Sequence, residues 1–214
     1  MSWLNLVAIE TGMIQIWASE HWLEEAAFVA SAVGVWLSTR RSLISWPVII
    51  VSCILYGEVF REARLFSDML LQGVFGICAV YGWWHWLRGV QADGSVTVEV
   101  LSWRGWVWGL MAGAAASVAL GFVMKQYFHA SLPWLDAALT GFSLVGQWWQ
   151  ARKYLANWWL WIAVDVIYIG EYVYKQLNLT AGLYGLFVLL AILGLRDWRR
   201  ALEQQNAAAL TGAA

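Results

Sequence analysis

Charged side chains are scarce in this sequence. Asp, Glu, Lys and Arg make up 13% of the 214 residues, while 61% are hydrophobic and the mean hydropathy is +0.59. A soluble domain of ordinary composition is roughly half apolar and has about a quarter charged residues. The net charge of −1 provides no basic surface of the kind that nucleic acid requires, so we expect no nucleic-acid partner. The composition instead predicts a protein embedded in the lipid bilayer.

Residues that build metal, disulfide and catalytic sites are also rare. The chain has two cysteines and three histidines, and none of them shows metal-ligand or disulfide spacing. It has no GxxxxGK[ST] phosphate loop, and no nucleophile, acid and base occur together in a recognisable motif. We therefore expect no metal, no cofactor and no enzymatic activity, so a membrane enzyme or a scaffold is the weakest of the functional hypotheses.

Tryptophan, by contrast, is abundant, with 18 residues, and many of its positions repeat at one spacing. An ungapped offset of 112 residues superimposes one part of the chain on another. The pairs at this offset include Trp22 and Trp134, Gly34 and Gly146, Trp36 and Trp148, Arg40 and Arg152, Trp46 and Trp158, Tyr56 and Tyr168, and Trp86 and Trp198. This register indicates an internal duplication of an apolar unit, and duplicated membrane units commonly bind a substrate where the two halves meet.

The apolar segments are the right length to cross a membrane. A spanning helix needs ~20 mostly apolar residues, and the sequence predicts seven such segments: 22–39, 43–60, 67–87, 104–125, 134–151, 157–175 and 178–196. The offset relates the first three to the last three, and the Ala- and Gly-rich fourth segment has no counterpart. Three spans and the fourth together return the chain to its starting side, so the second repeat runs in the same direction as the first. The two repeats are therefore predicted to be parallel and related by a symmetry axis along the membrane normal.

These segments give the expected organisation of an all-α membrane protein with a 3+1+3 arrangement. We expect an interfacial segment at 1–21, a first three-helix bundle at 22–90 and a linker transmembrane helix at 103–126. A second three-helix bundle at 134–198 and a cytoplasmic tail at 199–214 complete the chain.

Lys and Arg are distributed unequally between the two predicted faces. One face has Arg40, Arg41, Arg88, Arg104, Arg152, Lys153, Arg196, Arg199 and Arg200, whereas the other has Arg61, Arg64, Lys125 and Lys175. Positively charged loops stay in the cytoplasm, so the amino terminus is predicted to be outside and the carboxyl terminus inside.

Polar side chains at mid-membrane depth are the candidates for function, because each is costly unless it faces a cavity or a partner. The segment at 157–175 has one stripe at helical spacing that consists of Trp158, Trp161, Asp165, Tyr168 and Tyr172. A carboxylate among aromatic rings is typical of a cation-binding site. The alternative is structural, with Asp165 hydrogen-bonded to a neighbouring helix and the rings packed as a seam.

Three further residues join this predicted site. Gln147 lies about one turn from the Arg152 cluster, and its amide can both donate to and accept from hydroxyl or carboxamide groups. Gln72 and Trp46 are the first repeat's contributions, with Tyr184 and Trp158 at the equivalent positions. The residue equivalent to Asp165 is Cys53, so the ionisable group occurs in one half only and predicts one asymmetric substrate site.

Several motifs resemble those of a known family. The run LFSDMLLQ, the YGWWHW ending of the third segment and QWWQARK followed by NWWLW are similar to the Pnu family of bacterial vitamin transporters, in particular the PnuC nicotinamide riboside transporters. The similarity extends from Trp22 to Trp198. It implies a fold like that of the SWEET sugar transporters, a homotrimer in the bacterial inner membrane, and substrate binding between the bundles by Gln147, Trp158 and Trp161.

The resemblance also implies a mechanism, which is facilitated diffusion by rocking of the two bundles. A cytoplasmic kinase retains the imported vitamin by phosphorylating it, and this needs no contact between the kinase and the carrier. Nicotinamide riboside members have Asn at the position of Asp165, so a carrier of thiamine or of another cationic vitamin is the alternative. A phosphorylated nucleotide is expected to be excluded, because its anionic oxygens would approach a carboxylate.

Overall fold

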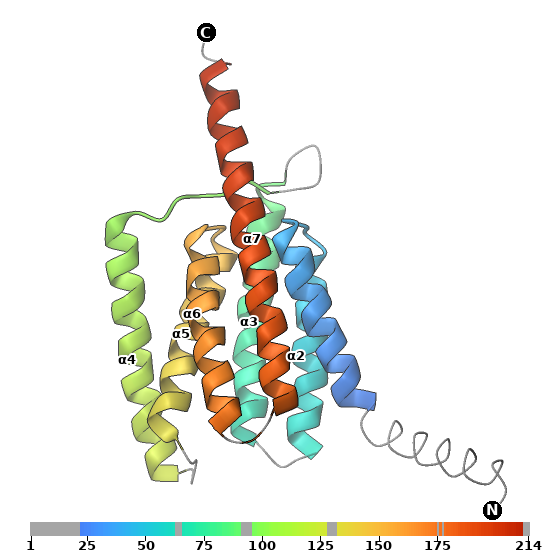
Figure 1. Cartoon of the computed structure of the whole chain (residues 1–214), viewed down its shortest axis with the longest axis vertical. Coiled ribbons are helices and arrows are strands. Elements are labelled where there is room, and N and C mark those ends of the chain that lie inside the picture. Colours follow the sequence, from blue (N-terminus) through green and yellow to red (C-terminus); the bar gives the residue numbers. More distant parts are fainter. Residues whose placement is uncertain are drawn as a thin grey trace, which may run out of the picture.

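Seven helices form nearly all of the described part of the computed structural model, which comprises residues 22–62, 66–90, 96–127, 132–174, 176 and 178–211 (Figure 1). They are the helix over 22–39, α2 (Ser45–Glu62), α3 (Phe66–Leu87), α4 (Trp103–Tyr127), α5 (Pro133–Ala151), α6 (Ala156–Tyr174) and α7 (Asn178–Thr211). No strand longer than an isolated bridge occurs in these ranges. The predicted interfacial segment 1–21 lies outside the described residues.

The predicted 3+1+3 arrangement is confirmed, and the helix bounds themselves repeat. The offset of 112 places the helix over 22–39 on α5, α2 on α6 and α3 on the first part of α7, with ends that agree to within one residue except at the end of α7. α4 has no counterpart and packs beside α5 (Figure 1). α7 continues 15 residues past the predicted span because the segment after Trp198 contains helix formers and no proline.

The turn after the first helix of each repeat has the same backbone conformation. Arg41 has φ 57° and Lys153, 112 positions later, has φ 64°. The Arg41 amide donates to the Ser38 carbonyl and the Lys153 amide donates to the Gln150 carbonyl, both at 3.0 Å. A non-glycine residue rarely adopts this left-handed conformation, so the match shows that the duplicated halves fold alike in detail.

Tryptophan organises the core in the same way in both repeats. Trp46 lies edge-on to Trp86 with centroids 5.2 Å apart, and Trp158 lies edge-on to Trp198 at 5.5 Å. All four indoles belong to one buried cluster that also includes Ala79 and Ala191. The cluster therefore joins α2 and α3 to α6 and α7 and forms the main core between the repeats.

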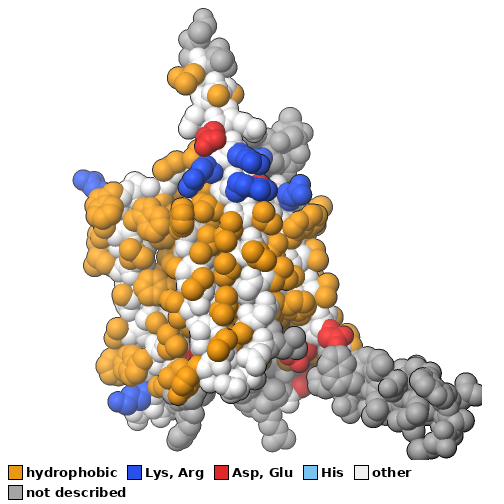
Figure 2. Space-filling view, in the orientation of Figure 1, with side chains coloured by type: hydrophobic (Ala, Val, Ile, Leu, Met, Phe, Trp, Pro, Cys, Tyr) orange, Lys and Arg blue, Asp and Glu red, His pale blue; other side chains and the backbone are white. Residues whose placement is uncertain are grey.

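The surface separates into an apolar band and charged ends. Large apolar side chains that remain exposed include Ile54, Leu70, Ile77, Phe122 and Leu189, each at least 60% exposed. Figure 2 shows this hydrophobic band along the helices, with Lys and Arg gathered at the end where α7 projects. Two helical segments, Trp103–Gln126 and Thr180–Leu210, are long and apolar enough to span a bilayer by length and hydropathy alone. The band is what a lipid-facing surface requires.

A short extended segment, residues 96–101, lies across the basic end. Val96 and Val98 are buried, and Glu99 exchanges backbone hydrogen bonds with Lys153 (2.9 Å) and Leu155 (3.0 Å). Gln205 of α7, with its amide nitrogen toward the Val98 carbonyl, donates to that oxygen at 3.2 Å and accepts from the Val98 amide at 3.1 Å. Burial lowers the pKa of Lys153, which the Glu99 carboxylate partly offsets. These hydrogen bonds join the segment to the second repeat, at the turn between α5 and α6 and at α7.

Candidate functional site

Asp165 is a buried carboxylate in the middle of α6. Its exposed fraction is 6%, and Val164 beside it is also buried. No ion pair in the described part of the chain involves Asp165, whereas Arg61 pairs with Glu58 and Arg196 with Asp197 at the surface. A buried carboxylate without a basic partner is costly. Asp165 therefore lies away from lipid, as the predicted site requires.

Three tyrosines cluster beside this carboxylate. The ring centroids of Tyr168 and Tyr184 are 4.6 Å apart, those of Tyr172 and Tyr184 are 5.1 Å apart, and those of Tyr168 and Tyr172 are 5.9 Å apart. Asp165 lies one turn before Tyr168 on the same face of α6. The equivalent positions in the first repeat are Tyr56, Phe60 and Gln72, so only the second repeat builds this cluster.

Gln147 faces inward from α5. It is 6% exposed, and its Nε2 has no hydrogen-bond partner among the residues that the structure describes. Thr140 and Ser143 are also buried and lie on the same face of α5, two turns and one turn before Gln147, respectively. The Ser143 hydroxyl hydrogen-bonds to Tyr168, which connects this polar face to the tyrosine cluster. A buried amide N–H without a partner is available to a ligand.

Trp46 and Trp158 lie deeper than a ligand-stacking role would suggest. Their exposed fractions are 0% and 1%, and each packs against another indole in the core between the repeats. The indole nitrogens of both have no hydrogen-bond partner within the described ranges. In this conformation the two rings are closed off, so stacking on a substrate would require the repeats to separate.

Trp161 is half-buried and is held by α5. Its indole nitrogen donates to Gln150 Oε1 at 3.1 Å, and its ring lies over Gly146, where a Cβ would be 3.1 Å from it. Gly34 and Ile49 are the equivalent pair in the first repeat, at 2.8 Å. Trp161 thus belongs to both the predicted site and the contact between α5 and α6.

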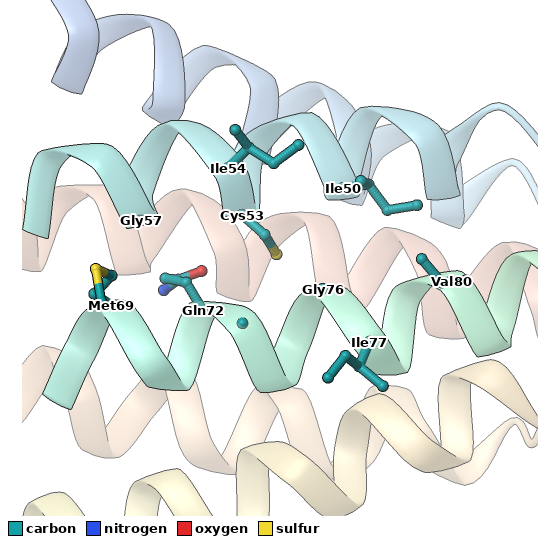
Figure 3. A pocket seen from close by; sticks show the side chains of 10 residues that line it. Ile50, Cys53, Ile54, Gly57, Met69, Gln72, Gly76, Ile77 and Val80 are labelled. Carbon is teal, nitrogen blue, oxygen red and sulfur yellow. The ribbon is translucent and has the colours of Figure 1, made fainter. Parts of the chain in front are cut away.

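Gln72 lies in a different place from the other predicted residues. It lines a groove of about 480 Å³ between α2 and α3, together with Cys53, Gly57, Met69 and Gly76 (Figure 3). The groove is open at Gly57 and Gly73, since a Cβ on either residue would meet no atom within 4 Å. No hydrogen bond in the described ranges joins Gln72 to Gln147 or Asp165, so its role in the site stays a prediction.

The sequence reasoning missed three residues of this region. The sequence identifies Tyr184 only as the counterpart of Gln72, and it does not predict Ser143 or Gln150 as site residues. The signal for Gln150 was its own position in the QWWQARK motif, where it is the second of two glutamines on one helix. Within the described residues, no group of three or more potential metal ligands occurs. The arrangement suits binding of a small polar and aromatic molecule rather than bond-breaking chemistry.

Comparison with known families agrees with this geometry. The sequence profile of the nicotinamide mononucleotide transporter family matches residues 21–200. The chain belongs to this family. Members of the nicotinamide mononucleotide transporter family are transporters, not enzymes, so the predicted absence of an enzymatic function is confirmed at the family level.

Characterised relatives differ in the vitamin that their names state. The riboflavin/roseoflavin transporter RibM of Streptomyces davaonensis is 29% identical, over 100% of this chain and 99% of its own length. The nicotinamide riboside transporter PnuC of Escherichia coli is 22% identical over 89% of this chain and 90% of its own. The crystal structure of the vitamin B3 transporter PnuC has the same fold, with a TM-score of 0.73 at 18% identity, covering 94% of this chain and 91% of that one.

Proposed function

We propose that this membrane transporter imports nicotinamide riboside by facilitated diffusion. The observation that supports this most directly is the buried Asp165 carboxylate, which lacks a basic partner in the described residues. Asp165 lies one turn before Tyr168, whose ring packs with those of Tyr172 and Tyr184. A pyridinium cation would neutralise that carboxylate, and aromatic rings attract a cation by ~0.5 to 2 kcal/mol. Gln147 Nε2 remains free to donate to the ribose or the carboxamide.

The proposed mechanism is alternating access between two bundles. We assign 22–90 and 134–198 to the two moving bundles and 103–126 to the linker that keeps them parallel. Trp158, Trp161, Trp46 and Gln72 are proposed to contact the substrate once the bundles separate. Phosphorylation of the vitamin by a cytoplasmic kinase would maintain net uptake, and the carrier would work as a homotrimer in the bacterial inner membrane with its carboxyl terminus in the cytoplasm.

The experiment is uptake of radiolabelled vitamin into proteoliposomes that contain the purified protein. We expect saturable uptake of nicotinamide riboside without ATP or an ion gradient. In Asp165→Ala, which removes the carboxylate, the affinity should fall about tenfold because a charge-assisted contact is lost. Glu58→Ala is the matched control, because Glu58 pairs with Arg61 at the surface. Equal affinity in wild type and Asp165→Ala would contradict the proposed site.

Riboflavin is a second candidate, because RibM matches this chain over its whole length. Its isoalloxazine ring is neutral, so a flavin carrier would use Asp165 as a hydrogen-bond acceptor for the ribityl hydroxyls or the ring N–H. Thiamine stays the cationic alternative. Uptake of all three vitamins is compared between wild type and Asp165→Ala. The loss of the carboxylate should weaken binding of the two cations much more than binding of riboflavin, which distinguishes a cation carrier from a flavin carrier.

A further inference from the structure

Ser38 and Gln150 are equivalent residues of the two repeats, and their side chains touch. Gln150 Nε2 donates to Ser38 Oγ at 3.0 Å, across the repeat offset of 112 residues. Equivalent positions of a two-fold arrangement can contact each other only near its axis. Ser38 and Gln150 therefore mark the place where the repeats meet on their pseudo-two-fold axis.

Two crossed hydrogen bonds surround this pair. Trp86 Nε1 donates to the Gln150 carbonyl at 3.2 Å, and Trp198 Nε1 donates to the Ser38 carbonyl at 3.0 Å. Trp86 and Trp198 are themselves equivalent, so the third helix of each repeat bonds the first helix of the other. Ser38, Trp86 and Trp198 are 0% exposed and Gln150 is 5% exposed. These four residues are called the inter-repeat contact below.

The inter-repeat contact lies at the basic end of the molecule. Ser38 is followed by Arg40 and Arg41, and Gln150 is followed by Arg152 and Lys153. The rings of Trp86 and Trp198, 5.8 Å apart, fill the space between the repeats at this end. A substrate that leaves between the bundles toward the basic end must pass this point, so the contact has to open during transport.

Gln150 also connects this contact to the predicted substrate site. Its Oε1 accepts the hydrogen bond from Trp161 Nε1 at 3.1 Å while its Nε2 bonds Ser38. One amide is thus shared between the Trp161 ring and the opposite repeat. A ligand that shifts Trp161 must move the Gln150 amide, and the bond to Ser38 depends on the position of that amide.

We propose that Gln150 is the positioning residue that couples substrate at Trp161 to the opening of the inter-repeat contact. The proposal rests on the proposed function, because it requires a substrate between the bundles. Before the substrate arrives, the three hydrogen bonds of the inter-repeat contact keep the basic end closed. When the substrate displaces Trp161, the Gln150 amide leaves Ser38, and the remaining two bonds no longer hold the indoles together.

The test uses a single reporter cysteine next to the contact. Ala151 is 0% exposed and belongs to the core between the repeats, so Ala151→Cys is labelled only when that core opens. Cys53 and Cys78 are first replaced by Ser. A membrane-impermeant charged thiol reagent is applied from the basic side, with and without saturating nicotinamide riboside, thiamine or riboflavin. Ala137→Cys is the control reporter, since Ala137 is also 0% exposed and lies on the same helix but near its opposite end.

We expect a transported vitamin to accelerate labelling of Ala151→Cys and not of Ala137→Cys. Adding Ser38→Ala should raise labelling without substrate about fivefold, the effect of one net hydrogen bond, while the affinity for the vitamin changes less than about twofold. Ser52→Ala is the matched variant, because Ser52 is buried and its hydroxyl bonds Ala27 within the first repeat. In Gln150→Ala, labelling should be high without substrate and should not change when a vitamin is added. The vitamin should still quench tryptophan fluorescence, which shows that it binds.

Other outcomes would overturn the coupling. If wild type transports a vitamin but Ala151→Cys stays unlabelled, the contact is a static joint and the proposed function stands without it. Equal labelling in Ser38→Ala and Ser52→Ala, or labelling in Gln150→Ala that still responds to substrate, would contradict the role of Gln150. If wild type shows neither uptake nor substrate-dependent labelling with all three vitamins, the proposed function and the coupling both fail.

Discussion

A Cβ atom on Gly194 would lie 2.6 Å from the indole of Trp158. Gly82 of the first repeat has the same relation to Trp46, at 2.4 Å. Trp46 and Trp158 are among the largest fully buried side chains of the molecule, so neither ring can move aside without disturbing the core between the repeats. Each glycine is thus required by a close approach of helix and indole.

Gly194→Ala is predicted to destabilise the protein by overpacking, at a cost of ~1–3 kcal/mol. Thermal unfolding in detergent should show a lower Tm. Gly185→Ala is the matched control on the same helix, because its Cβ would meet no atom within 4 Å. That variant should have an unchanged or slightly higher Tm, since alanine favours a helix over glycine by roughly 0.5–1 kcal/mol. Equal Tm values in the two variants would contradict the close packing at Trp158.

Trp86→Phe and Trp198→Phe are predicted to have similar effects, because the two indoles donate equivalent hydrogen bonds to Gln150 and Ser38. Each substitution removes one buried hydrogen bond, while the carbonyl still accepts from the Lys153 or Arg41 amide, so the expected cost is that of one net hydrogen bond, ~0.5–1.5 kcal/mol. Trp103→Phe is the control, since Trp103 is 79% exposed. Unfolding in detergent monitored by circular dichroism measures all three. A large effect in only one of the two buried variants would show that the repeats are not equivalent here.

Tyr184→Leu is predicted to weaken vitamin binding, because Tyr184 contacts both Tyr168 and Tyr172 beside Asp165. The loss of one ring from a cation-binding cluster should cost ~0.5–2 kcal/mol, or roughly two- to thirtyfold in affinity. Tyr174→Leu provides the control, because Tyr174 is 72% exposed near the end of α6. Quenching of tryptophan fluorescence reports the affinity. If both variants bind like wild type, the tyrosine cluster is a packing feature only.

Gln205→Ala is predicted to loosen the segment 96–101 at the basic end. The Gln205 amide makes both of the hydrogen bonds that join α7 to the Val98 backbone. Hydrogen exchange measured by mass spectrometry should become about fivefold faster around Val98, because one to two net hydrogen bonds are lost. Gln204→Ala removes an identical but exposed neighbour and should leave the exchange unchanged. Unaltered exchange in Gln205→Ala would mean that Glu99 and Lys153 alone hold the segment.

The site was predicted less completely than the fold. Asp165 and Gln147 were identified because polar groups at mid-membrane depth are conspicuous against an apolar sequence, and both are buried. Tyr184 and Gln150 were missed because their importance comes from neighbours on other helices. Sequence spacing places residues on a face of their own helix, but it does not reveal which helix faces them.

The duplication, the 3+1+3 order of the helices and the parallel direction of the repeats all follow from the sequence alone. This was possible because the bilayer fixes the length of each span, and because an odd number of spans fixes the direction of the second repeat. Only the tertiary structure decided that Ser38 meets Gln150, that Trp46 and Trp158 are closed in the core, and that Gln72 lies in a groove between α2 and α3. Those contacts depend on how each helix is rotated about its axis and crosses its neighbours, and packing sets both.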